Sequence, residues 1–320
     1  MAATPSGFVT ANLNYFLEPE NGGDKLYRAG TVGEKRRKYK EVQMQINDIR
    51  GREDSFTLDQ HGFQLVKSDT AEETFDDEQR IQTLYYDECA ELIKKVTGAT
   101  LVKPFAHVVR RLSWKDAYDA EKDLPDDARS VGASNARFVH CDQSYNGSCE
   151  RIKQVFPEDS EKLNNCRWAY INVWRPFDYP ATRDALCFAD YASIREDEIR
   201  PITIQFPNKR DSVLVSDENC NNPGAMLENG ERDPYAHGPE MITSEALQCA
   251  APQTPDQHKW YYASEMKPDE ALLLKIRDSK KGVANRLFHS SFEAASDYGP
   301  DRHSLEVRCA VFFEDQPLNE

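Results

Sequence analysis

The sequence predicts a mainly β protein with flanking helices, in which the strands form a jelly roll of the cupin-like type. From residue 136 onward, short runs rich in β-branched and aromatic residues alternate with clusters of Gly, Pro, Asn and Asp. Such runs with turn signals between them are typical of antiparallel sandwiches and barrels. Eight strands in two sheets form a jelly roll, and the sequence offers eight runs: ARFVHCD, CRWAYINVWRPF, ALCFADYASI, ITIQF, KWYYASEM, EALLLKIRD, RLFHSSF and SLEVRCAVFF.

The 320 residues are enough to bury a sizeable core, and we expect one domain, 1–320. Residues 1–130 look mixed and are expected to pack, as an α/β part, on a strand core formed by residues 131–320. The clearest helix, 77–98, has an apolar stripe, two late lysines and a terminal glycine, and an extended segment follows at 100–111. The basic segment 27–40 is expected to be an exposed loop, and the polar segment 216–257 a loop or lid at the active site.

The composition argues against several classes of protein. A formal net charge of −15 disfavours nonspecific nucleic-acid binding, and no stretch approaches the roughly 18 apolar residues of a membrane-spanning helix. Residues 1–16 have neither a basic start nor an apolar run, so we expect no secretory signal. The eight cysteines are scattered without a CxxC pair, which favours reduced thiols in a cytoplasmic enzyme. We therefore expect a small-molecule partner, and the oligomeric state stays open.

A candidate metal site begins at the end of the first run. His140 and Asp142 are two positions apart on an expected strand, so their side chains point to the same side while Cys141 points away. The pair is weak evidence by itself, because a chain this rich in acidic residues should contain such a pair by chance. Two imidazoles and one carboxylate on one face of an iron leave three positions for substrates, as in non-haem Fe(II) oxygenases. A second histidine must then come from a later run, and the candidates are His237, His258, His289 and His303.

The final run favours His289 as the third ligand. A keto acid that chelates the iron leaves a second carboxylate in need of a cation and a hydroxyl donor. Arg302 follows His289 by 13 residues, a spacing that suits adjacent antiparallel strands, and Ser304 shares the strand face of Arg302. If His303 were the ligand, only Arg308 would follow it, five residues later, too close to cross a hairpin.

Substrate contacts are predicted from one strand of the core. Tyr170, Asn172 and Trp174 alternate along the run CRWAYINVWRPF and are expected to point to one face. Inward-facing side chains on that strand would line the space beside the metal.

Longer motifs accompany these residues, and together they resemble a known family. They are DIRGREDSFTLDQHGFQL near residues 48–65, the HCD triplet, NVWRPF at 172–177, the stretch from MKPDEALLLKIRDS to FHSSF, and RHSLEVRCAVFF. Over most of the chain these motifs resemble the fungal and bacterial family that includes the fungal gibberellin desaturase, the cephamycin 7α-hydroxylase component and the asaB-type hydroxylase/desaturases. The Arg-x-Ser at Arg302 and Ser304 is also similar to the co-substrate motif of 2-oxoglutarate oxygenases generally.

The resemblance implies a double-stranded β-helix that uses Fe(II), 2-oxoglutarate and O₂. It implies metal ligands at His140, Asp142 and His289, and oxidation of a small secondary metabolite or amino-acid-derived substrate by hydroxylation, desaturation or ring closure. Family members differ widely in substrate, so the reaction outcome does not transfer. Arg308 shares the strand face of Arg302 and is an alternative co-substrate ligand. Arg175 is expected to hold 2-oxoglutarate, to anchor substrate or to form a buried ion pair.

Two other classes of function compete with this interpretation. A cupin-like zinc hydrolase or isomerase would use His and Asp ligands without needing the Arg-x-Ser pair. A non-catalytic metabolite-binding jelly roll would have no use for an intact HCD triplet. The pair at Arg302 and Ser304 disfavours the first alternative, and the HCD triplet disfavours the second.

Overall fold

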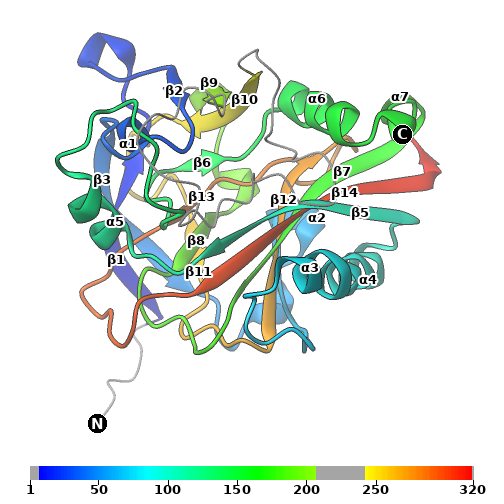
Figure 1. Cartoon of the computed structure of the whole chain (residues 1–320). Helices are drawn as coiled ribbons and strands as arrows, with labels where there is room; N and C mark the ends of the chain where they lie inside the picture. The colour runs from blue at the N-terminus through cyan, green and yellow to red at the C-terminus, as the bar shows by residue number, and fades with distance from the viewer. Residues whose placement is uncertain (1–6, 207–241, 319–320) are drawn as a thin grey trace.

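In a computed structural model, which describes residues 7–206 and 242–318, the strands form two β-sheets (Figure 1). The larger sheet has nine strands in the order β1-β3-β11-β8-β13-β6-β10-β9-β2, and the smaller has five in the order β4-β12-β7-β14-β5. The strands are β1 Phe8–Tyr15, β2 Leu26–Arg28, β3 Lys40–Asp48, β4 Phe63–Lys67, β5 Leu101–Arg110, β6 His140–Cys141, β7 Cys166–Pro176, β8 Leu186–Ala189, β9 Ile199–Phe206, β10 Ile242–Cys249, β11 Trp260–Tyr262, β12 Glu270–Asp278, β13 His289–Ser291 and β14 Ser304–Pro317.

Short helices connect and cover these strands. The longest helical stretch joins α3 (Glu78–Arg80), a π-helical turn (Ile81–Tyr85) and α4 (Tyr86–Thr97), and Gly98 ends it with a φ of 74°. The other helices are α1 Val32–Lys35, α2 Leu58–His61, α5 Trp114–Glu121, α6 Tyr145–Val155 and α7 Lys162–Asn165, with 3₁₀ turns at Pro19–Asn21, Glu53–Ser55, Pro157–Asp159, Tyr191–Ser193 and Glu196–Glu198. None of the helices in these described ranges is long and apolar enough to cross a membrane.

The predicted β architecture is confirmed, with corrections in two segments. Each of the eight runs contains a strand, and the helix predicted over 77–98 is present. Residues 242–249 of the predicted lid instead form β10, which pairs with β9 and β6 and whose last four residues, 246–249, are all buried. Residues 216–241 of that segment lie outside the described residues. The segment 27–40 is not simply an exposed loop either: it contains the end of β2 and α1, and several of its side chains are half-buried.

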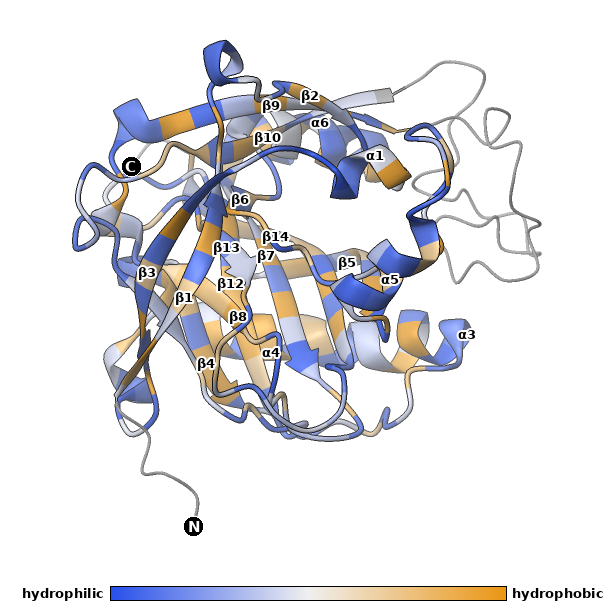
Figure 2. Ribbon diagram, turned by 90° about the vertical axis from the view of Figure 1, so that its left-hand side faces the viewer, coloured by the Kyte–Doolittle hydropathy of each residue, from blue (hydrophilic) through white to orange (hydrophobic). Residues whose placement is uncertain are grey.

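The first 130 residues are built into both sheets. Strands β1 and β3 form one edge of the larger sheet, β2 forms its other edge, and β4 and β5 form the two edges of the smaller sheet. The two sheets face each other, and hydrophobic and hydrophilic residues alternate along several strands (Figure 2). This N-terminal part therefore contributes strands as well as the covering helices α3 and α4.

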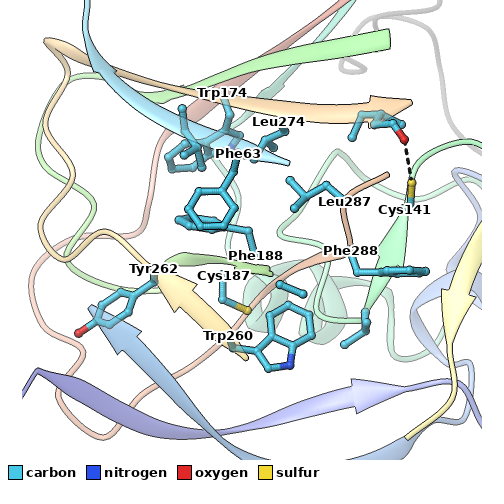
Figure 3. Packing of buried hydrophobic residues seen from close by; sticks show 14 of the residues in the cluster. Phe63, Cys141, Trp174, Cys187, Phe188, Trp260, Tyr262, Leu274, Leu287 and Phe288 are labelled. Carbon is cyan, nitrogen blue, oxygen red and sulfur yellow. Dashed lines mark hydrogen bonds between the residues drawn. The ribbon is translucent and has the colours of Figure 1, made fainter. Parts of the chain in front are cut away.

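The main core fills the space between the sheets (Figure 3). Phe63 and Phe188 meet there with ring centroids 4.3 Å apart, and Trp260 is fully buried beneath them. Cys141 also points into this core, where its thiol donates to the carbonyl of Ile276 at 3.4 Å. The apolar side chain of β6 is thus buried, and the residues on either side of it in sequence face the opposite way.

A second core lies on the other face of the smaller sheet. It joins β7 and β14 to the helical stretch α3–α4 through Ala169, Ile171 and Val173 on β7 and Ile81, Tyr85 and Ile93 on the helices. By contrast, Trp168, Tyr170 and Trp174 belong to the main core. The even-numbered residues of β7 therefore face the larger sheet, and the odd-numbered residues face the helices.

Candidate metal centre

His140, Asp142 and His289 lie together at the centre of the larger sheet. His140 on β6 and His289 on β13 are direct partners across an antiparallel pair, with ring centroids 4.4 Å apart. Both Nε2 atoms approach the same carboxylate oxygen of Asp142, Oδ1, at 3.4 and 3.5 Å. One potential ligand atom from each residue lies within 4.8 Å of the others. Two imidazoles and a carboxylate in this arrangement are the donor set of a non-haem Fe(II) site.

Hydrogen bonds prepare these groups for a cation. His140 Nδ1 donates to the carbonyl of Phe138 at 2.8 Å, which leaves the lone pair on Nε2, the atom that faces Asp142. The second carboxylate oxygen of Asp142, Oδ2, accepts from Asn172 Nδ2 at 2.8 Å and lies 3.6 Å from the guanidinium of Arg308. One oxygen of Asp142 is therefore held by the protein, and the other points to both imidazoles.

The protonation states of this cluster suit metal binding. Burial disfavours the charged form of Asp142, but Arg308 and the two histidines outweigh it and hold the pKa of this carboxyl well below its usual range. Burial, followed by the neighbouring His140, lowers the pKa of His289 to about 3. At neutral pH, Asp142 is therefore ionised and His289 is neutral, the forms that a metal requires.

The low pKa of His289 makes the metal-free protein sensitive to acid. An unfolded histidine titrates near 6.5, so between that pH and about 3 the unfolded chain binds a proton that the folded chain does not. Unfolding is then favoured as the pH falls, and this one group should cost about 2 kcal/mol between pH 7 and pH 5. Urea unfolding of the apoprotein should show this loss, and a His289→Asn variant should lose less stability over the same interval. Equal pH slopes for the two proteins would contradict the assignment.

Arg302 and Ser304 lie on the same inner side as the metal cluster. The guanidinium of Arg302 is 5.3 Å above the ring of Trp174 and donates to the carbonyl of Asp184 and to Asn135 Oδ1. Arg302 is 3% exposed, and burial lowers its pKa to about 9. Its Nε and the buried Ser304 hydroxyl have no hydrogen-bond partner among the described residues. A buried cation beside an unsatisfied hydroxyl fits an incoming carboxylate, because burial of either group alone is unfavourable.

Arg308 contacts the metal cluster directly through Asp142, whereas the described contacts of Arg302 are with other residues. It pairs with Asn172 across β14 and β7, and its Nε donates to Glu306 Oε1 at 3.3 Å. Burial, followed by the charge of Asp142, raises the pKa of Glu306. These contacts connect Arg308 to the ligand carboxylate rather than to the Arg302–Ser304 pair.

The structure does not bring Arg175 to this cluster. Arg175 is an odd-numbered residue of β7 and so faces the helices, where its guanidinium donates to Ser68 Oγ and to the carbonyl of Pro268, both at 3.2 Å. It also lies 5.2 Å from the centre of the Tyr85 ring. The first two predicted roles, holding 2-oxoglutarate and anchoring substrate, do not fit this position. Within the described residues Arg175 forms no buried ion pair either, because it contacts a hydroxyl, a carbonyl and an aromatic ring.

This position predicts a structural effect for Arg175. An Arg175→Met variant should lower the free energy of unfolding by about 2 kcal/mol, since it removes two hydrogen bonds to a buried charged group. It should leave the KM for 2-oxoglutarate unchanged. Urea denaturation and steady-state kinetics measure the two effects, and a large rise in that KM would restore Arg175 to the co-substrate site.

The three residues predicted to contact substrate share the inner face of β7, as expected, but differ in their surroundings. Asn172 is fully buried against Asp142. Tyr170 packs edge-on against Phe105 in the core, and Trp174 lies under Arg302. Direct substrate contact by these side chains stays a prediction. Strand parity placed Asn172 on the inner face but did not show its partner. In the structure, the Asn172 side chain donates a hydrogen bond to the metal ligand Asp142.

The other candidate histidines are occupied elsewhere or fall outside the description. His258 is buried between the Tyr15 hydroxyl at 3.1 Å and Glu198 at 3.2 Å. His303 contacts Asp178 at 2.7 Å and so faces away from the Arg302 side. His237 lies outside the described residues. Of the three candidates within the described residues, His289 is the one that lies beside His140.

Sequence reasoning missed the residues that surround His140 on its other side. Phe138 lies 4.5 Å from the His140 ring, and Tyr39 stacks on Phe138. Gln248 on β10 is the strand partner of His140. Phe138 could have been found from the same parity that paired His140 with Asp142, whereas Tyr39 and Gln248 reach the site from distant segments that carry no local signal.

Comparison with known proteins agrees with this geometry. A family model described as an oxidoreductase/YMDC permease-like domain matches residues 13–223 and 239–312. The chain is 41% identical to the hydroxylase/desaturase CTB9 of Cercospora beticola, over 97% of this chain and 88% of that protein. It is 38% identical to the hydroxylase/desaturase efuI of Hormonema carpetanum, over 98% of each.

A solved structure shows the same fold. The iron and alpha-ketoglutarate-dependent endoperoxidase NvfI superposes with a TM-score of 0.70 at 23% identity, covering 97% of this chain and 99% of that one. The double-stranded β-helix architecture expected from the resemblance is thereby confirmed. The chain matches the hydroxylase/desaturases over nearly its whole length and has a His-Asp-His cluster, so it belongs to the hydroxylase/desaturase family, whose homologues include Fe(II)/2-oxoglutarate-dependent dioxygenases.

Proposed function

We propose that this protein oxidises a small secondary metabolite or an amino-acid-derived compound by hydroxylation, desaturation or oxidative cyclisation. His140, Asp142 and His289 hold Fe(II), and 2-oxoglutarate and O₂ are the co-substrates. The observation that supports this most directly is the approach of two imidazole Nε2 atoms to one oxygen of a buried, ionised carboxylate. When bound, the iron supplies the oxidising chemistry, and the chain supplies position and exclusion of water.

Different residues around the metal bind the co-substrate and orient the metal ligand. Arg302 and Ser304 bind the distal carboxylate of 2-oxoglutarate, since they offer a buried cation and an unsatisfied hydroxyl on the inner face. Asn172 and Arg308 hold Oδ2 of Asp142, so that Oδ1 stays directed at the metal position. Outer contacts of this kind fix the orientation of metal ligands and tune their affinity.

The proposal also covers the domain organisation and the cellular location of the protein. The chain acts as one oxygenase domain, because strands of its N-terminal part form edges of both sheets. It works in the cytoplasm, where thiols stay reduced, and all the cysteines of the described residues are free.

The first experiment is anaerobic addition of Fe(II) and 2-oxoglutarate to the purified apoprotein. A weak visible charge-transfer band is expected, as a chelated keto acid gives on such an iron centre. Zinc-loaded protein is the control, because zinc has no partly filled d shell and gives no such band. Absence of the band in iron-loaded protein would favour a zinc hydrolase or isomerase, and failure to bind any metal would favour a non-catalytic jelly roll.

The second experiment defines the reaction. Candidate metabolites are screened for succinate release, and the mass of each product is measured. A gain of one oxygen means hydroxylation, and a loss of two hydrogens means desaturation or ring closure. Succinate release that no metabolite stimulates, from a library that spans these classes, would argue against a small-molecule substrate.

A further inference from the structure

The guanidinium of Arg37 lies among three aromatic rings beside the metal cluster. Its central carbon is 4.3 Å from the ring centre of Tyr27, 5.3 Å from that of Tyr39 and 5.8 Å from that of Phe138. Tyr39 and Phe138 are nearly parallel, at 9°, with centroids 5.5 Å apart. We call these four side chains the Arg37 wall. They combine flat aromatic surface with a planar cation.

The Arg37 wall is continuous with the metal cluster. The ring of Phe138 is 4.5 Å from the ring of His140, and the Phe138 carbonyl accepts the hydrogen bond that fixes this imidazole. Arg37 also donates at 3.2 Å to Gln248, the strand partner of His140. Burial, followed by the charge of Glu34, raises the pKa of Tyr27 well above its usual range, and Asp142 adds a smaller effect. All four side chains are half-buried, so each keeps some surface exposed to solvent.

Arg37 has donors to spare. A guanidinium carries five N–H groups, and Arg37 uses three contacts: the Tyr39 hydroxyl and Gln248, each at 3.2 Å, and the carbonyl of Asp24 at 3.4 Å. Its Nε is buried and has no hydrogen-bond partner within the described part of the chain. No carboxylate of the described residues forms an ion pair with it. Glu34, the nearest acidic neighbour in sequence, interacts with the charge of Arg37, but its carboxylate accepts its hydrogen bond from the amide of Gly30.

We propose that the Arg37 wall positions the substrate for oxidation, and that it selects a planar, conjugated molecule carrying an acceptor oxygen such as a carboxylate, phenolate or ring carbonyl. A flat ring gains most from stacking on aromatic side chains, because a puckered ring makes fewer contacts with the same surface. An acceptor oxygen satisfies the spare donors of Arg37, and charge-assisted bonds of this kind are the stronger ones. This inference rests on the proposed function, since it places the substrate beside the iron that His140 helps to hold.

A different role for the same residues is purely architectural. Arg37 would then only attach residues 27–40 to β10. Its loss would lower the melting temperature of the protein and reduce the affinity for every ligand by the same factor. A selective role predicts instead that the loss of Arg37 reduces the affinities for different ligands by different factors. The experiment therefore compares the affinities of several ligands.

The experiment uses three probes of similar size with the anaerobic Fe(II)–2-oxoglutarate protein. They are 2-naphthoate, which is flat and carries oxygens, decahydro-2-naphthoate, which carries the oxygens but is puckered, and 2-methylnaphthalene, which is flat without oxygens. Binding is measured by calorimetry while the visible band reports retention of 2-oxoglutarate. We expect 2-naphthoate to bind about tenfold more tightly than either other probe.

Arg37→Gln should remove about tenfold of the affinity for 2-naphthoate and leave that for 2-methylnaphthalene unchanged. Lys38→Gln is the matched control, since it removes one positive charge from an exposed neighbour, and it should change neither. If the glutamine variant does not fold, Arg37→Lys carries the test, because it keeps the charge but loses the planar fork.

Three results would overturn the inference: no preference among the probes, an equal loss for all of them in Arg37→Gln, or loss of the visible band on addition of 2-naphthoate. The last would mean that the probe displaces 2-oxoglutarate. A protein that never shows the band contradicts the proposed function itself, whereas a band with no effect of Arg37 contradicts only the role of the Arg37 wall.

Discussion

Replacement of Asp142 by alanine is expected to abolish Fe(II) binding and, with it, 2-oxoglutarate turnover. Asp142 is the one carboxylate of the cluster, and both imidazoles point at its Oδ1. Loss of an outer contact alone costs roughly 10–100-fold in metal affinity, so loss of the ligand should exceed about a hundredfold. Metal content by mass spectrometry, the visible band and succinate release should all fall together.

The control for this variant is Asp126→Ala, which removes a carboxylate that is 71% exposed and paired with Arg36 on the surface. It should retain full metal content and turnover. Asn172→Ala should give an intermediate result, because Asp142 keeps its charge but loses the amide that orients it. An Asp142→Ala protein that still held iron and turned over 2-oxoglutarate would defeat the assignment of the metal centre.

Replacement of Arg302 by glutamine is expected to raise the KM for 2-oxoglutarate by about a hundredfold while Fe(II) binding persists. Truncation of one partner of a buried, hydrogen-bonded charge pair costs roughly 2–5 kcal/mol, and each 1.4 kcal/mol is about tenfold. Ser304→Ala should raise the same KM by about tenfold, since it removes one hydroxyl donor. Steady-state succinate release at varied 2-oxoglutarate gives both values.

Arg308→Gln is the informative comparison, since the sequence left Arg302 and Arg308 as alternatives. Arg308 lies 3.6 Å from Oδ2 of Asp142, so its loss should weaken Fe(II) binding more than it raises the KM for 2-oxoglutarate. The reverse pattern, with Arg308 controlling the KM and Arg302 controlling the metal, would exchange the two roles.

The two arginines show how strand register determines function beyond strand parity. Arg302 and Arg308 are six residues apart and share a face, so parity cannot separate them. The pairing of β14 with β7 places Arg308 opposite Asn172, next to Asp142, and leaves Arg302 over Trp174. Arg308 therefore lies against the carboxylate of Asp142, whereas Arg302 lies two residues from Ser304, whose hydroxyl has no hydrogen-bond partner among the described residues.

Local sequence determined much of this site. The alternation of side chains along a strand is a local property, and it paired His140 with Asp142 and directed Cys141 into the core. The same rule placed Asn172 and Trp174 on the inner face. It also implied that Arg175, which is odd-numbered on β7, faces the helices and not the metal cluster.

Only the tertiary structure decided the remaining contacts, because they join segments that are distant in sequence and have no periodic relation. The antiparallel pairing of β13 with β6 set His289 opposite His140. The fold brought Arg37 into a hydrogen bond with Gln248, which is 211 residues away in sequence and is the strand partner of His140. The sequence by itself therefore determined the β architecture and the composition of the metal centre, whereas the packing of distant strands decided which arginine lies against Asp142, which lies over Trp174 and which side chains surround His140.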